Sequence, residues 1–130
     1  MTDDAPPSHS PTGLRERLSF ATRNSIRGIK FTYLKEQAFR HEVYLLVAAF
    51  PVGFVIAPSF TWYVAMIGVL LLVMAVELLN TGLEKLCDHV MAEHHPQIGI
   101  VKDCGSAGVL FSLLLAGLIW FAAFLERFFG

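Results

Sequence analysis

Long apolar stretches occupy much of the chain after its first third, and they cover residues 43–57, 60–79 and 109–125. A helix rises about 1.5 Å per residue, so about twenty residues cross a hydrocarbon core of about 30 Å. The first stretch reaches this length if its helix starts near Gln37, because Arg40 and Glu42 can then lie at headgroup level. The pattern predicts an all-α membrane protein with spans over about 37–57, 60–79 and 107–126.

A basic amphipathic helix is predicted over residues 14–34, where apolar side chains recur at helical intervals with arginines and lysines between them. We expect this helix to lie on the membrane surface with its cations toward anionic headgroups. Residues 1–13 are rich in proline and polar residues, which predicts a disordered tail. Residues 14–130 are expected to form a single membrane domain.

The first two spans are predicted to form a hairpin. A short uncharged turn at Pro58 links them, an aromatic pair suited to the interface follows at Trp62 and Tyr63, and Pro51 should bend the first span. Seven of the ten cations precede the first apolar stretch, two lie between the second and third, and one follows the third. The positive-inside rule therefore predicts that the N-terminus and residues 80–106 are cytoplasmic and that the C-terminus lies outside.

Composition narrows the classes of function. Hydrophobic residues make up 55% of the 130 residues and charged residues 16%, whereas soluble domains average about 25% charged residues. The ten Lys and Arg nearly balance the eleven Asp and Glu, so the chain has no basic surplus with which to bind nucleic acid. Cys87 and Cys104 lack the spacing of a zinc site or a disulfide framework, and we expect both to be reduced thiols.

Glu77 interrupts the end of the second apolar stretch, and a charge at the centre of a membrane helix costs about 2.5–3.5 kcal/mol on insertion scales. A structural explanation is that its carboxylate snorkels to the interface or accepts an interhelical hydrogen bond. Asn80, Glu84 and Asp88 follow it by three, seven and eleven positions, which places all four within about 80° on one helical face. A continuous helix would hold Glu77 at the membrane edge, near a lipid hydroxyl, and Glu84 and Asp88 nearer a water-soluble reactant.

This polar face predicts a magnesium site, because Mg²⁺ usually takes one or two carboxylates plus substrate phosphates. Lys102 and Ser106 lie four residues apart at the entry to the third span. The lysine would offset phosphate charge or act as a snorkelling anchor, and the serine would cap the helix or bind a substrate. The sequence contains neither a P-loop nor the glycine-rich motif of protein kinases.

Residues 77–88 (ELLNTGLEKLCD) and 102–110 (KDCGSAGVL) resemble the signatures of the small bacterial integral-membrane diacylglycerol kinases. The likeness runs from about Arg17 to the C-terminus and includes residues 36–42 (EQAFRHE). It implies a homotrimer with three membrane helices and a surface helix per chain, active sites shared between subunits, and a place in the bacterial inner membrane. It also implies phosphorylation of diacylglycerol to phosphatidate with ATP and Mg²⁺.

The same resemblance implies roles for individual residues. Glu77 matches the general base that takes the proton of the lipid hydroxyl. Glu36 and Glu84 match metal ligands, and Asn80 and Asp88 match residues that organise the site. The residues expected to contact ATP are Arg17, Asn24, Glu36, Glu84, Glu93, His94, His95, Lys102 and Asp103. The residues expected beside the lipid substrate are Glu77, Arg40 and Ser106.

Three positions depart from the usual family pattern, since Asn24 and His94 often correspond to aromatic residues and Gly82 to alanine. The glycine costs about 0.5–1 kcal/mol of helix propensity. An undecaprenol kinase is the nearest alternative, and residues 36–42 and 102–107 favour diacylglycerol over it. A non-catalytic channel or assembly subunit would use an intramembrane carboxylate but has no need of a phosphate-facing lysine.

Overall fold

The computed structural model describes residues 12–130 as four helices joined by short links. The helices are α1 (Leu14–Lys35), α2 (Gln37–Ile56), α3 (Phe60–Val90) and α4 (Pro96–Phe129). The all-helical fold expected from the sequence is confirmed, and α2, α3 and α4 are each long and apolar enough to cross a membrane. Most of the predicted tail, residues 1–11, lies outside the described residues.

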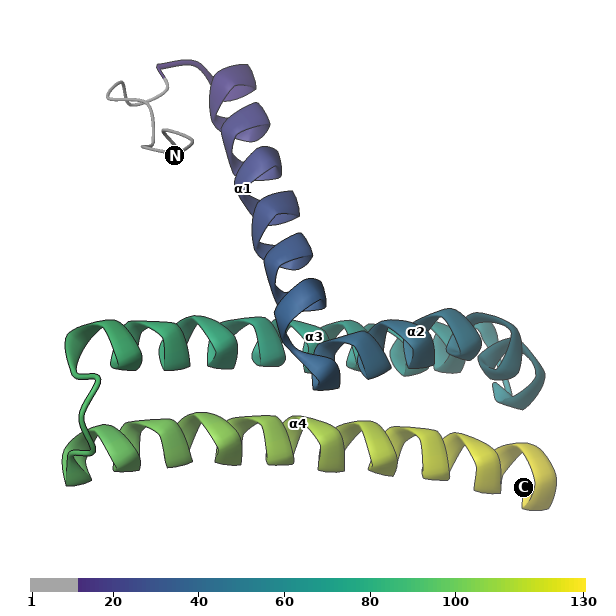
Figure 1. The fold of residues 1–130 in the computed structure, drawn as a ribbon. Helices are drawn as coiled ribbons and strands as arrows, with labels where there is room; N and C mark the ends of the chain where they lie inside the picture. Colours follow the sequence, from purple (N-terminus) through teal and green to yellow (C-terminus); the bar gives the residue numbers. More distant parts are fainter. Residues whose placement is uncertain (1–11) are drawn as a thin grey trace.

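Helices α2, α3 and α4 run along a common direction, whereas α1 stands across it (Figure 1). Helix α1 contacts α2 and α3, and most of its length projects away from the other three helices (Figure 1). Leu14, Leu18 and Ile26 on α1 remain exposed. A helix that crosses the direction of the spans and keeps an apolar side free is suited to lying on a membrane surface.

The corner between α1 and α2 is fixed by Arg40. Its Nη1 donates to the carbonyl oxygens of Tyr33 and Leu34 at 3.0 Å and 3.2 Å. These carbonyls belong to the last turn of α1, whose acceptors have no partner within their own helix. A cation there also complements the negative end of the helix dipole, so Arg40 holds the surface helix at its angle to the first span.

The long helices begin at residues that cap them. The Ser59 side chain accepts a hydrogen bond from the Trp62 backbone N–H at 3.3 Å at the start of α3. At the start of α4, Nδ1 of His95 accepts from the Gln97 N–H at 3.2 Å, and Pro96 occupies the first helical position. Proline is favoured there because its missing N–H would have no partner anyway.

The most extensive packing joins α3 to α4. Val69, Val73 and Ala116 form its buried apolar core, against which Trp120 packs. The indole Nε1 of Trp120 donates to the Met66 carbonyl at 3.1 Å, which satisfies a polar group that lipid could not. The apolar windows of the three candidate spans are 17%, 28% and 17% buried within the chain, so most of their apolar surface is free to face lipid or other chains.

The start of α4, and with it the place of Ser106, differs from the prediction. Helix α3 continues past the apolar stretch to Val90, as the polar face requires, whereas α4 begins at Pro96 rather than near residue 107. Ser106 therefore lies inside α4, and the prediction that it could cap the helix start is wrong because His95 does so. Helix α2 continues through Pro51.

Candidate functional site

The predicted polar face of α3 is present as one continuous strip. Glu77 is only 8% exposed, Asn80 and Glu84 are half-buried, and the Asp88 side chain is 60% exposed. Asn80 Nδ2 donates to Glu84 Oε1 at 3.4 Å, one helical turn away. Exposure therefore rises along the strip from the apolar part of α3 toward its free end.

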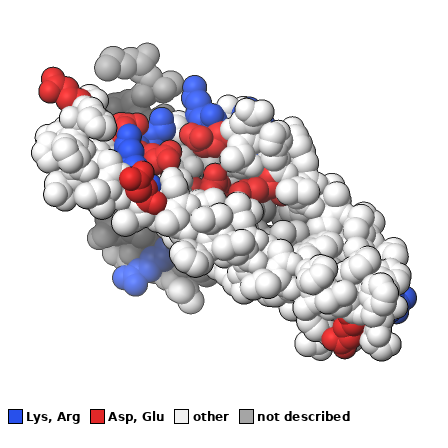
Figure 2. Space-filling view, turned by 90° about the horizontal axis from the view of Figure 1, so that it is seen from below, with Lys and Arg blue, Asp and Glu red and all other residues white. Residues whose placement is uncertain are grey.

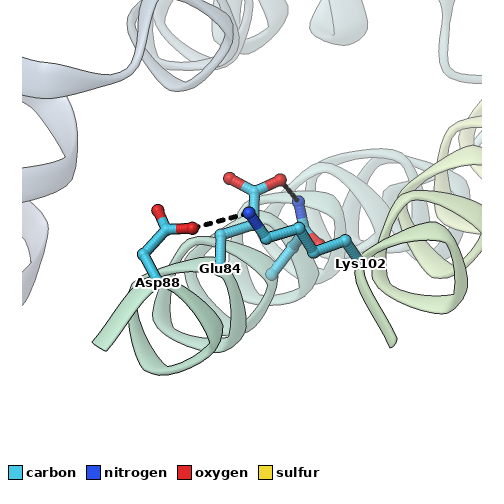
Figure 3. A network of polar contacts seen from close by, with 4 residues as sticks. Glu84, Asp88 and Lys102 are labelled. Carbon is cyan, nitrogen blue, oxygen red and sulfur yellow. Dashed lines mark hydrogen bonds and ion pairs between the residues drawn. The ribbon is translucent and has the colours of Figure 1, made fainter. Parts of the chain in front are cut away.

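Helix α4 supplies a cation to the outer end of this strip. Lys102 Nζ donates to Asp88 Oδ1 at 2.6 Å. The two side chains form the one ion pair identified between residues of the described range 12–130. Figure 3 shows the two side chains pointing toward one another from facing helices, with Glu84 beside them. A short charge-assisted hydrogen bond of this kind is stronger than a neutral one, so Asp88 holds the lysine over the carboxylates.

Gly105 permits the close approach of α3 and α4 at Asn80. A Cβ atom at this glycine would collide with Asn80 Oδ1 and lie 3.1 Å from Leu83 Cδ2. The backbone of α4 therefore passes directly over the amide of Asn80, and any larger residue would displace that amide. The glycine sets the spacing of the two helices that carry the polar strip and Lys102.

Three buried acceptor atoms lie where the strip enters the apolar part of the fold. Within residues 12–130, Glu77 Oε2, Glu42 Oε2 and Asn80 Oδ1 are buried and have no hydrogen-bond partner in the protein. Buried polar groups without a partner are rare and costly. The carboxylates of Glu77 and Glu42 lie near enough for their charges to interact, and their free oxygens are acceptors, so this place is suited to a ligand that brings a donor, such as a hydroxyl group.

Negative charge is concentrated around Glu77. The charges of Glu84 and Glu36 both act on its carboxylate, and Glu77 in turn repels Glu42. Within the described residues, no three His, Cys, Asp or Glu side chains are grouped so as to hold a metal ion by themselves. A divalent cation that completed its shell with substrate phosphates would still fit, because it would offset this repulsion.

A small hollow opens beside Lys102 at the link between α3 and α4. Its volume is about 210 Å³, and its lining includes Asp88, Glu93, His94, His95 and Lys102. Four of these five residues were predicted to contact ATP, and the structure brings them together at one place. The hollow is smaller than the roughly 300–1,000 Å³ of typical ligand pockets, so one chain would not enclose a whole nucleotide.

Other predicted site residues lie elsewhere. Arg17 and Asn24 are exposed on α1, and Asn24 lines a second hollow between α1 and α3. Asp103 and Ser106 are exposed on α4. Arg40 binds the end of α1, a structural task that the resemblance did not indicate, and its predicted contact with lipid substrate stays a prediction.

Sequence reasoning missed two contributors. Glu42 was assigned to headgroup level, yet it is half-buried and its charge reaches Glu77. The presence of a charged residue inside the first predicted span could have indicated that Glu42 lies near the site. Gly105 carried no signal beyond its place between Lys102 and Ser106.

Figure 2 shows that acidic and basic side chains gather over one part of the surface, while a long stretch beside them carries no charge.

A comparison with protein families shows which family model this chain matches. Residues 23–124 match the family model described as prokaryotic diacylglycerol kinase. The matched range contains α2 and α3 completely and most of α4. It therefore includes the polar strip, Lys102 and Gly105.

Curated relatives agree with the family model. The diacylglycerol kinase of Haemophilus influenzae is 37% identical over 112 residues, covering 86% of this chain and 94% of the relative. That of Pseudomonas aeruginosa is 38% identical over 114 residues, covering 88% and 92%. That of Escherichia coli (strain K12) is 32% identical over 104 residues, covering 80% and 85%.

Proposed function

Because the chain belongs to the prokaryotic diacylglycerol kinase family, a family of lipid kinases, we propose that it transfers the γ-phosphoryl group of ATP to the hydroxyl of diacylglycerol. The products are phosphatidate and ADP. The observation that carries the proposal is the carboxylate strip of α3, which starts at the buried Glu77 and ends under Lys102 of α4. It combines a base at the edge of the apolar region with a cation for phosphate.

Glu77 is proposed as the general base. Its buried Oε2 has no hydrogen-bond partner within residues 12–130, which supports a role as the acceptor of the hydrogen of a lipid hydroxyl. As the hydroxyl oxygen forms a bond to the γ-phosphorus, the bond from that phosphorus to the β–γ bridging oxygen breaks. The hydroxyl proton passes to the Glu77 carboxylate, and ADP leaves with the electron pair of the broken bond.

Lys102 is proposed to offset the charge that develops on the transferring phosphoryl group. To do so it exchanges its contact with Asp88 for a phosphate oxygen. Glu93, His94 and His95 line the adjoining hollow and are proposed to surround the nucleotide, with Asp103, Arg17 and Asn24 as further contacts.

Glu36 and Glu84 are proposed to hold Mg²⁺ together with the nucleotide phosphates. When bound, the ion would neutralise phosphate charge and orient the γ-phosphoryl group. The support is the repulsion that both carboxylates exert on Glu77, which a cation between them would relieve. Asn80 fixes one oxygen of Glu84 through its amide, leaving the other oxygen for a ligand.

A homotrimer with shared active sites is proposed as the working form. A hollow of about 210 Å³ holds only part of a nucleotide, and Arg17 and Asn24 lie on a helix that projects from the rest of the chain (Figure 1). A neighbouring chain would complete the enclosure. The apolar faces of the spans, less than one third buried within one chain, supply surface for such contacts.

The site is proposed to face the cytoplasm of a bacterial inner membrane. Six of the ten cations precede α2 and a seventh, Arg40, lies in its first turn, at the end of the molecule that carries the polar strip. The positive-inside rule places that end in the cytoplasm, where ATP is available. The C-terminus of α4 then lies on the outer side.

The proposal is tested by supplying labelled ATP and Mg²⁺ to the purified protein in mixed micelles with either diacylglycerol or undecaprenol. We expect label in phosphatidate. Absence of label in both lipids would overturn the kinase assignment, and preferential labelling of undecaprenol would reassign the lipid substrate while keeping the mechanism.

A further inference from the structure

The link between α3 and α4 ends in a histidine that holds the start of α4. His95 precedes Pro96, the first residue of that helix. Its Nδ1 accepts a hydrogen bond from the Gln97 N–H at 3.2 Å, and its carbonyl oxygen accepts from the Gly99 N–H at 3.0 Å. The first turn of α4 is therefore attached to His95 through both the side chain and the backbone.

The side-chain bond fixes the protonation state of the His95 ring. An imidazole nitrogen accepts a hydrogen bond only when it carries no hydrogen. The capping ring is therefore neutral, with its hydrogen on Nε2. A protonated ring carries a hydrogen on both nitrogens, so its Nδ1–H would face the Gln97 N–H and the cap would be lost.

A titratable cap is unlike the cap of the other long helix. Helix α3 is capped by Ser59, and a serine hydroxyl does not gain a charge near neutral pH. Histidine changes its charge between about pH 5 and 8. Protonation would also place a positive charge at the N-terminus of α4, where the partial charge of the helix dipole is already positive.

The charged groups around His95 come from α3, the link and α4. The hollow that it lines also receives Asp88 from α3, Glu93 and His94 from the link, and Lys102 from α4. The two carboxylates favour a protonated ring, and the lysine disfavours it. None of these side chains can restore the cap, because a protonated Nδ1 is no longer an acceptor.

We propose that His95 is a pH-sensitive cap, which holds the first turn of α4 when its ring is neutral and releases it when the ring is protonated. The capped form binds one proton fewer than the released form, so the cap is present at neutral pH and is lost as the pH falls. Release loosens Ile98 and Gly99, which line the hollow beside Lys102. The effect on nucleotide binding rests on the proposed function, whereas the loss of the cap does not.

Hydrogen exchange of the purified full chain without nucleotide tests this proposal. Exchange of the Gly99 and Ile100 amides, corrected for the intrinsic effect of pH, is compared at about pH 7.5 and about pH 5.5. We expect protection to fall about fivefold at the lower pH, since the loss of a cap costs about 1 kcal/mol. Protection of residues 113–120, farther along the same helix, should not change.

Two substitutions separate the cap from the titration. His95→Asn keeps an acceptor suited to the cap and cannot be protonated in this range, so protection should stay high at both pH values. His95→Ala removes the acceptor, so protection should be about fivefold lower at both. His94→Asn is the matched control, because it removes the neighbouring imidazole, and it should keep the pH response of the unmodified protein.

A pH response that persists in His95→Asn would overturn the proposal, as would its loss in His94→Asn or its absence from the unmodified protein. The exchange measurement needs no turnover. Its failure would leave the labelled-ATP test of the kinase proposal intact, and absence of phosphoryl transfer would leave the exchange result standing.

Discussion

The α3–α4 pair is built differently at its two ends. At the end near their link, residues 77–90 and 96–106 meet through the Lys102–Asp88 ion pair and the close approach at Gly105. We call this the polar half. Toward the other end, residues 60–76 and 107–129 meet through Val69, Val73, Ala116 and Trp120. We call this the apolar half.

The difference separates stability from chemistry. The apolar half holds the helices together by close packing, which dominates helix association in lipid. The polar half contains buried acceptors without partners at Glu77 and Asn80, a costly arrangement that packing elsewhere must support. We therefore expect substitutions in the polar half to reduce activity and those in the apolar half to reduce stability.

Among the substitutions at Lys102, Gly105, Val73 and Gly82, Lys102→Gln is expected to give the largest loss of activity. Removing one group that stabilises developing phosphate charge should lower kcat/KM about 10²–10³-fold. The melting temperature should change little, because the ion pair with Asp88 is largely exposed. Arg127→Gln, at the opposite end of α4, is the control for loss of a cation and should retain activity. Equal losses in both variants would contradict the assignment of phosphate contact to the polar half.

Gly105→Ala adds one carbon at the closest approach of the two helices. The new Cβ would force the Asn80 amide to turn, which breaks its 3.4 Å hydrogen bond to Glu84. We expect labelled phosphoryl transfer to fall about ten- to hundredfold, since small displacements in a site are costly. Gly108→Ala is the matched control, because its Cβ would meet Val76 Cγ1 at an ordinary 4.0 Å. Similar activity in the two variants would show that the spacing at Asn80 is unimportant.

Val73→Ala tests the apolar half. Val73 is 2% exposed in the core, and removing its two methyl groups should lower the free energy of unfolding by about 1–2 kcal/mol. Activity per folded chain should stay within about twofold. Leu72→Ala, at a side chain that is 47% exposed in the chain, is the control for loss of apolar volume. Denaturant titration in mixed micelles measures the free energy of unfolding of both variants. A large loss of activity per folded chain in Val73→Ala, with little loss of stability, would contradict the division between the two halves.

Gly82→Ala is expected to have the smallest effect. A Cβ atom at this position meets nothing within 4 Å, so the substitution should stabilise α3 by about 0.5–1 kcal/mol through helix propensity. Activity should be unchanged, although the position lies inside the polar half. Denaturant titration and labelled phosphoryl transfer measure the two quantities, and a loss of activity would show that this face of α3 also takes part in the reaction.

The sequence was sufficient to predict features that depend on one helix. The spacing of Glu77, Asn80, Glu84 and Asp88 placed them on one face, and the structure confirms a continuous helix beneath them. The apolar stretches likewise predicted three candidate spans. The apolar residues alone do not indicate the early start of α4, although Pro96 is a typical first helical residue.

Features that depend on the register between helices could not be predicted. The contact of Lys102 with Asp88 joins residues fourteen positions apart across the link, and the approach of Gly105 to Asn80 depends on the same register. The role of Arg40 at the end of α1 depends on the angle of the corner. Periodicity within a single helix carries no information about these relations.

The most direct measurement compares Glu77→Gln with Glu126→Gln, each purified and supplied with labelled ATP, Mg²⁺ and diacylglycerol. Glu126 is an exposed carboxylate at the far end of α4, so its replacement controls for the loss of one negative charge. The account predicts that transfer falls about 10²–10⁴-fold in Glu77→Gln and stays near normal in Glu126→Gln, with melting temperatures close to that of the unmodified protein. Near-normal transfer in Glu77→Gln would contradict the assignment of the general base and with it the placement of the chemistry in the polar half.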